Sequence, residues 1–251
     1  MGASLRIRSI LHYIVAVGEV PDTKTLTHET NRLIESIGFK YFGIFSRPKP
    51  IEDTSELIIS ANWPREWVER YVAKKYIVWD PLVRYLLRTY CSFSWTTAID
   101  AYRASSQFRR MKSMLADMHS HGLEAGYVFP VFSRTGLVGA TSIGGTEEVE
   151  LSPSEIALLE TAFRNAFFKY LEFTDVSHGI SLAPGADISI TLREMQALNN
   201  LAEGRTSPEI ASILDVSANT VDWYVNSLQT KLKARNRNHA VAIAFRQGLI
   251  S

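Results

Sequence analysis

The sequence predicts an α+β protein of two domains: an α/β/α sandwich around a mainly antiparallel sheet, then a small all-α helix-turn-helix domain. Its length of 251 residues suits two domains, and 46% hydrophobic residues allow each to bury a core. Helical and strand-like patterns are mixed before residue 174, whereas only helical patterns follow residue 189. The stretch between is rich in Gly, Ser, Ala and Pro, which is typical of a linker. We therefore expect domains at 1–174 and 189–251, with a linker at 175–188.

In the first domain, helices and strands are expected in a mixed order. Apolar residues recur at helical spacing, and Gly38, Asp80 and the run Ser152-Pro153-Ser154-Glu155 mark helix ends or starts. Short apolar runs between turn residues predict strands. The expected helices cover residues 7–17, 26–37, 64–76, 81–88, 107–121 and 154–173. The expected strands cover residues 41–46, 56–61, 127–132 and 137–143.

The last third of the chain predicts two short helices joined by a tight turn. Gly204 can adopt the left-handed conformation that ends a helix, and Thr206 and Glu209 have the spacing of a capping box. Ser217 can cap the next helix, whose apolar stripe is Val221, Val225, Leu228 and Leu232. A capped helix with a polar outer face after a short turn indicates a DNA-reading helix-turn-helix, and a protein-binding module is the alternative for this motif alone.

Further motifs run in register through the same region. They are Glu194 and Leu198, the run Thr206-Ser207-Pro208-Glu209-Ile210-Ala211, the pairs Thr220-Val221 and Lys231-Leu232, and the closing Gly248-Leu249-Ile250. With these motifs, residues 191–250 resemble the DNA-binding domain of the LuxR-type regulators. One position departs from the family pattern, because many members have His where this chain has Tyr224.

The first domain contains a second set of spaced residues. Taken alone, an aromatic stripe is more typical of a helix's core face, and an Asp before Pro is typical of a helix cap. Together they resemble the autoinducer-binding domain of the same family; the segments are Trp63-Pro64-x-x-Trp67-x-x-x-Tyr71, Asp80-Pro81, Phe93-x-Trp95 and Gly122-Leu123-x-x-Gly126-x-x-x-Pro130. The resemblance implies a quorum-sensing transcriptional regulator whose ligand is an N-acyl-homoserine lactone, with no other cofactor.

The chemistry of the lactone suits these residues. Its amide N–H needs an acceptor, which Asp80 can supply, and its ring carbonyl needs a donor, which by position is the indole N–H of Trp67. Tyr71 and Trp95 are expected to form walls of the pocket, and Ser142 is expected to meet the acyl carbonyl.

Trp63 is a departure within the expected ligand site. Many members of the family have Tyr at this position, and the Tyr hydroxyl often joins the carbonyl contact. An indole cannot accept a hydrogen bond and is bulkier than a phenol. We therefore expect Trp63 to give a smaller or differently shaped acyl pocket.

DNA contacts are expected from the polar face of the second helix of the motif. Asn226 and Gln229 are candidates for reading adenine, Lys231 for a phosphate, and Thr220, Trp223 and Thr230 share the face. Such proteins usually read palindromic sites as two-fold homodimers, and RNA polymerase is a further implied partner. Two dimer seams are candidates. One is formed by Phe163, Phe167 and Phe168, which could instead pack on the sheet of their own domain. The other is the stripe Ala240, Val241, Ile243 and Ala244.

The charge distribution and the cysteine content indicate where the protein acts and what it contacts. The net charge is only +1, but the chain has no acidic residue after Asp222, so its cations give a local basic surface. Cys91 is the sole cysteine, which excludes an intramolecular disulfide and favours the cytoplasm. No stretch is long and apolar enough to predict a membrane span.

The sequence disfavours two other functions and leaves one alternative open. An enzyme is disfavoured because no phosphate loop, metalloprotease motif or nucleophile elbow occurs, and because His119 and His121 do not face each other on a helix, so no metal site is expected. A response regulator needs acidic residues after its strands, and Arg47 follows the first one here. The remaining alternative is a LuxR-type regulator that responds to a different small molecule.

Overall fold

The computed structural model of the chain describes residues 3–47, 57–134, 136–174 and 189–250. The chain divides into two compact units, residues 1–132 with 137–180 and residues 181–251 with 133–136. The expected linker lies outside the described residues. None of the described helices is long and apolar enough to cross a membrane.

A five-stranded sheet forms the middle layer of the first unit, in the order β2-β1-β5-β4-β3. β1 (Tyr41–Ser46) pairs antiparallel with β2 (Ile58–Ala61) and with β5 (Gly136–Gly145). β3 (Phe93–Ser94) pairs antiparallel with β4 (Ala125–Ser133) and has no counterpart among the expected strands. The expected mainly antiparallel sheet is confirmed.

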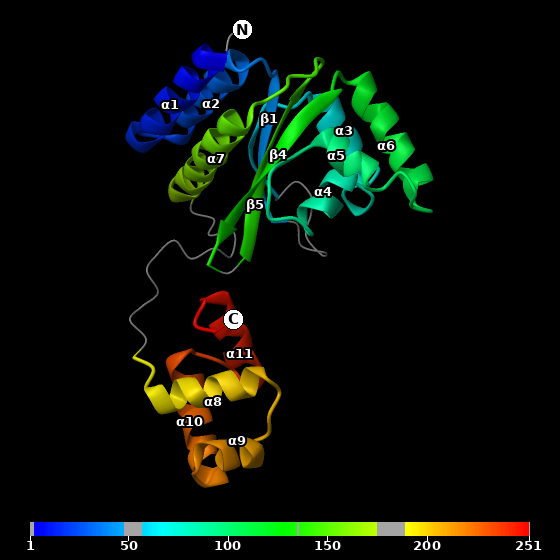
Figure 1. Cartoon of the computed structure of the whole chain (residues 1–251). Helices are drawn as coiled ribbons and strands as arrows, with labels where there is room; N and C mark the ends of the chain where they lie inside the picture. The colour runs from blue at the N-terminus through cyan, green and yellow to red at the C-terminus, as the bar shows by residue number, and fades with distance from the viewer. Residues whose placement is uncertain (1–2, 48–56, 135, 175–188, 251) are drawn as a thin grey trace. The chain divides into compact units, whose positions relative to one another are not determined.

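Helices cover both faces of the sheet (Figure 1). One face carries α1 (Ala3–Glu19), α2 (Thr23–Ser36) and α7 (Pro153–Phe173). The other face carries α3 (Arg65–Ala73), α4 (Pro81–Leu86), α5 (Trp95–Asp100) and α6 (Phe108–Ser120). The first unit is therefore the α/β/α sandwich that the sequence predicts.

The first of these helical layers holds a large apolar core. α7 begins with a capping box in which Ser152 Oγ accepts the N–H of Glu155 at 3.3 Å, as its sequence indicates. Phe163 and Phe167 are fully buried in this core, while Phe168 is only partly buried. A dimer seam through Phe163 and Phe167 is therefore wrong, because their rings are consumed by the domain's own packing.

The second layer differs from its predicted elements in two places. The helix expected over residues 64–76 stops at Ala73, because Lys75 adopts a left-handed φ of 51°, and a 3₁₀ turn, η2 (Tyr76–Val78), follows. α5 was not expected, although Ser94 caps it by accepting the N–H of Thr97 at 3.1 Å. A helix of six residues is too short for apolar periodicity to show.

The second unit is all-helical. It contains α8 (Leu192–Ala202), α9 (Ser207–Leu214), α10 (Ala218–Lys231) and α11 (Arg237–Arg246). Three sequence signals are confirmed: a left-handed φ of +80° at Gly204, the capping box of Thr206 and Glu209, and the cap of Ser217 on the N–H of Thr220.

The apolar faces of all four helices of this unit contribute to its core. The predicted stripe Val221, Val225, Leu228 and Leu232 is buried. On α11, Ala240 and Ala244 are also core residues, so they are excluded from a dimer seam, while Val241 and Ile243 are half-buried. The helix-turn-helix thus presents the remaining face of α10 to solvent.

Candidate functional site

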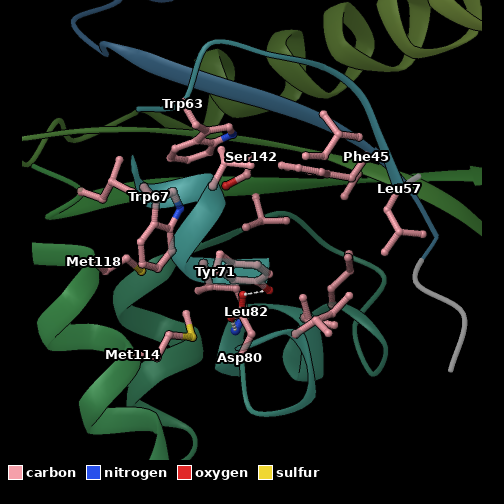
Figure 2. A pocket seen from close by; sticks show the side chains of 18 of the residues that line it. Phe45, Leu57, Trp63, Trp67, Tyr71, Asp80, Leu82, Met114, Met118 and Ser142 are labelled. Atoms are coloured by element: carbon pink, nitrogen blue, oxygen red, sulfur yellow. Dashed lines mark hydrogen bonds between the residues drawn. The ribbon is translucent and has the colours of Figure 1, made fainter. Parts of the chain in front are cut away.

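A cavity of about 150 Å³ lies between the sheet and the second helical layer. A cavity of this size can hold a small organic molecule. Its walls are mostly apolar, and Asp80 is the only charged residue among the described residues that line it. All six residues predicted to meet a ligand line this one space: Trp63, Trp67, Tyr71, Asp80, Trp95 and Ser142 (Figure 2).

The sheet forms one side of the cavity, where small residues of β1 and β5 leave room for aromatic rings. Gly43 on β1 faces Ser142 on β5, and Phe45 faces Ala140 in the same register. Because alternate residues of a strand share a face, Gly43 and Phe45 of β1 lie on the same face of the sheet as Ser142 and Ala140 of β5. A side chain at Gly43 would collide with the Trp63 indole and the Phe45 ring, so glycine is required for both rings to occupy these positions.

Trp63 forms part of an aromatic stack on this side of the cavity. Its ring lies 6.1 Å from that of Tyr41 and 5.9 Å from that of Trp95, with interplanar angles of 20° and 25°. Its Nε1 is buried and has no hydrogen-bond partner in the described part of the chain. Trp63 therefore forms a bulky aromatic wall of the cavity, and its effect on acyl selectivity stays a prediction.

Asp80 is the polar centre of the cavity. It caps α4 by accepting the N–H of Leu82 on Oδ1 at 2.7 Å, and Oδ2 accepts the Tyr71 hydroxyl at 2.8 Å (Figure 2). Burial raises the pKa of Asp80 to about 6, although these hydrogen bonds favour the carboxylate. The carboxylate accepts the Tyr71 hydroxyl and backbone N–H groups at the start of α4, and it keeps lone-pair capacity for a further donor.

The other polar side chains of the cavity differ in whether they keep a free hydrogen-bond donor for a ligand. Trp95 Nε1 donates to Ser142 Oγ at 3.2 Å, so the Ser142 hydroxyl keeps its own hydrogen for an acceptor in the cavity. Trp67 Nε1 donates to no group within the described residues. The site thus combines one carboxylate acceptor with two separate donors, Ser142 and Trp67.

Several apolar residues of the cavity were not singled out from the sequence. Met114 and Met118 enter from α6, and Phe45, Leu57 and Leu82 close the remaining sides (Figure 2). The helical spacing of Met111, Met114 and Met118 predicts a buried face, but it does not distinguish a cavity wall from a solid core.

The polar face of α10 is open to solvent. Trp223 is 64% exposed, and Asn226 and Thr230 are also exposed, whereas Thr220 and Gln229 are half-buried. Gln229 Nε2 donates to Asn226 Oδ1 at 3.0 Å, which leaves the amide hydrogens of Asn226 free to donate outward.

The phosphate contact expected of Lys231 does not fit the bonds that its ammonium group makes. Its Nζ donates to both carboxylate oxygens of Glu194, at 2.7 and 2.8 Å, and to the backbone oxygen of Ser189 at 2.7 Å. These bonds use all three donors of the ammonium group, so none is left for a phosphate. Burial alone would raise the pKa of Glu194, but hydrogen bonds from Lys231, Ser227 and Thr191 outweigh it and lower the pKa to about 2. Lys231 is therefore a structural residue that joins α8 to α10.

Comparison with known proteins gives two family matches and a set of relatives that span nearly the whole chain. Residues 22–170 match the autoinducer binding domain, and residues 189–244 match the bacterial regulatory proteins of the luxR family. The transcriptional activator protein BjaR1 of Bradyrhizobium diazoefficiens is 22% identical over 97% of each chain. The quorum sensing-dependent regulator RpaR of Rhodopseudomonas palustris is 26% identical over 97% of this chain and 95% of its own.

A solved structure has the same fold. The structure of SdiA in complex with octanoyl-rac-glycerol aligns with a TM-score of 0.62 at 22% identity, covering 98% of this chain and 95% of that one. The regulatory protein SdiA of Escherichia coli is also 24% identical in sequence over 89% of each chain.

Proposed function

The chain belongs to the LuxR family of quorum-sensing transcriptional regulators, with an autoinducer-binding domain followed by a DNA-binding helix-turn-helix, and we propose that its ligand is an N-acyl-homoserine lactone. We further propose that it acts as a homodimer on a palindromic promoter site. RNA polymerase is the proposed partner there, and because promoter DNA lies in the bacterial cytoplasm, so does the protein.

The observation that carries the ligand proposal is the Asp80 carboxylate in an apolar cavity. A buried carboxylate is costly unless it gains hydrogen bonds, and a secondary amide N–H is a donor that it can bind strongly. The lactone has one such amide, placed between two carbonyls. Trp67 is the proposed donor to the ring carbonyl, and the free hydrogen of Ser142 is the proposed donor to the acyl carbonyl. Tyr71, Trp95 and Trp63 enclose the remainder.

The DNA proposal is supported by the open face of α10. Asn226 and Gln229 can pair with adenine edges, Trp223 can contact a thymine methyl group, and Thr220 and Thr230 lie where they can meet the backbone. Lys231 is left out of this set because Glu194 holds it.

Thermal unfolding of the purified chain against a panel of acyl-homoserine lactones tests the ligand proposal. A stabilisation that depends on acyl length, and that Asp80→Asn abolishes, supports it, because a ligand that binds only the folded state stabilises that state. If no lactone changes the transition of a well-folded wild type, the lactone proposal fails.

One observation favours a second candidate, a regulator that responds to a different small molecule. SdiA, whose fold this chain shares, has been solved in complex with octanoyl-rac-glycerol. An acylglycerol has hydroxyl donors but no amide. Octanoyl glycerol therefore belongs in the same panel, and a response to it without a response to any lactone favours this candidate.

A further inference from the structure

Asp117, on α6 outside the cavity, gathers donors from two other elements. Its Oδ1 accepts Arg70 Nη1, from α3, at 2.8 Å, and its Oδ2 accepts Nζ of Lys74, the residue just beyond α3, at 2.8 Å. The hydroxyl of Tyr76, at the start of η2, donates to the same Oδ2. One carboxylate therefore ties α3 and η2 to α6.

Tyr76 is the buried member of this cluster, and its ring packs against two residues that line the cavity. Tyr76 is only 5% exposed, whereas the side chains of Arg70 and Lys74 are nearly half exposed, so solvent screens their ion pairs. The Tyr76 ring lies 6.2 Å from the Trp67 ring, nearly parallel to it, and 6.0 Å from the Tyr71 ring.

A residue at the end of α6 also packs against Trp67. The His121 ring, just beyond the end of that helix, lies 5.9 Å from the Trp67 ring, and its Nδ1 donates to the backbone oxygen of Asp117 at 2.6 Å. Met114 and Met118, which flank Asp117 in sequence, line the cavity (Figure 2). The same turn of α6 thus shapes one wall and anchors the residues of another.

Apart from the packing of Trp67, α3 has few features of its own to stabilise it. It is nine residues long, no side chain caps its N-terminus, and a helix of this length is marginal without tertiary contacts. Its exposed ion pair, Arg65 with Glu69, lies within the helix and does not connect it to a neighbour.

We infer that Asp117 is a positioning residue, which through Tyr76 fixes Trp67 and Tyr71 at the geometry needed to recognise the lactone ring without itself contacting the ligand. The inference rests on the proposed function for its ligand, but not for the placement of Trp67. Loss of a charge-assisted hydrogen bond to a buried hydroxyl such as that of Tyr76 typically weakens the interaction that it supports about tenfold.

The test compares the affinities of wild type and variants for two ligands that differ only in the ring. Asp117→Asn and Tyr76→Phe, which keeps the ring but removes the hydroxyl, are each titrated with a lactone and with the N-acyl cyclopentylamine of the same acyl chain. The cyclopentylamine lacks the ring carbonyl that Trp67 is proposed to meet. We expect each variant to weaken lactone binding about tenfold and cyclopentylamine binding far less. Glu69→Gln, an exposed carboxylate on α3, is the matched control and is expected to change neither.

Equal losses for both compounds would mean general loosening of the domain, which overturns the inference. A second readout needs no ligand: ¹⁹F NMR of protein labelled with 5-fluorotryptophan, with the Trp67 resonance assigned by Trp67→Phe. Both variants are expected to shift that resonance and leave the one from Trp223, in the other domain, unchanged. If the Trp67 resonance does not move, the inference fails even when lactone binding is weakened. If wild type binds no lactone but the resonance moves, the inference stands and the proposed function fails.

Discussion

Replacing Asp80 with Asn is expected to stabilise the ligand-free protein. Asp80 is 5% exposed, and burial raises its pKa from 3.8 to about 6 against the opposing effect of bonds from Tyr71 and Leu82. The folded state therefore holds the proton more tightly than the unfolded state. The cost of ionisation appears as the pH rises through this interval and is constant above it, where it reaches about 3 kcal/mol. An Asn side chain does not ionise, so the variant avoids this cost.

Urea unfolding of the ligand-free protein, followed by tryptophan fluorescence, measures the effect. We expect wild type and variant to be nearly equal at about pH 4, and the variant to be more stable by up to about 3 kcal/mol at about pH 8. Asp100→Asn is the control, because Asp100 is half exposed and pairs with Arg103 at the surface. A variant that is less stable than wild type by the same amount at every pH would refute the reasoning from burial.

The same variant separates stability from ligand response. A lactone at about one hundred times its dissociation constant is expected to stabilise wild type by about 2.7 kcal/mol and Asp80→Asn hardly at all. Since Asn still offers an oxygen for the N–H of Leu82, the helix cap survives and the loss is specific to the ligand. An equal gain in both proteins would exclude Asp80 as the amide acceptor.

Three further predictions concern selectivity, DNA reading and the second domain. Trp63→Tyr removes an unpaired N–H and enlarges the cavity above Gly43, so longer acyl chains are expected to gain affinity relative to shorter ones in a binding panel; an unchanged ranking means that Trp63 does not set selectivity. Asn226→Ala is expected to weaken operator binding about tenfold in fluorescence anisotropy while leaving a non-specific duplex unaffected, and an equal loss on both would assign Asn226 to the backbone. Glu194→Gln is expected to destabilise the DNA-binding domain by about 3 kcal/mol near neutral pH, because the pKa of Glu194 is lowered from 4.5 to about 2. That stabilisation is present above 4.5 and lost as the pH falls toward 2, so the difference in chemical unfolding must shrink on acidification.

The sequence was most informative where local chemistry decides the structure. Capping residues such as Ser152, Thr206 and Ser217 act on backbone groups within three positions, so their spacing alone predicts the helix starts. The residues expected around the cavity come from four separate segments, and no spacing rule joins them. Their grouping followed from family resemblance rather than from periodicity.

Contacts between distant segments were beyond prediction. Lys231 lies in a basic run, which indicated a phosphate contact, but its partner Glu194 lies 37 positions earlier. The sequence does not distinguish Asp117 from a surface residue, because an isolated Asp on an amphipathic helix is typical of a solvated face. Its partners Arg70, Lys74 and Tyr76 come from 41 to 47 positions earlier in the chain.

Three carboxylates of this chain show how the ligand site differs from structural ion pairs. Hydrogen bonds from Lys74 and Tyr76 hold the pKa of Asp117 at about 2, and a bond from Lys231 contributes to the equally low pKa of Glu194. Asp80 is as buried as Glu194, yet within the described residues no Lys or Arg forms an ion pair with it, and its pKa rises instead. A buried acid without a cation costs stability, and strongly perturbed groups of this kind cluster at functional sites. The charge that the fold leaves uncompensated therefore lies where an amide donor from outside the chain is proposed to bind.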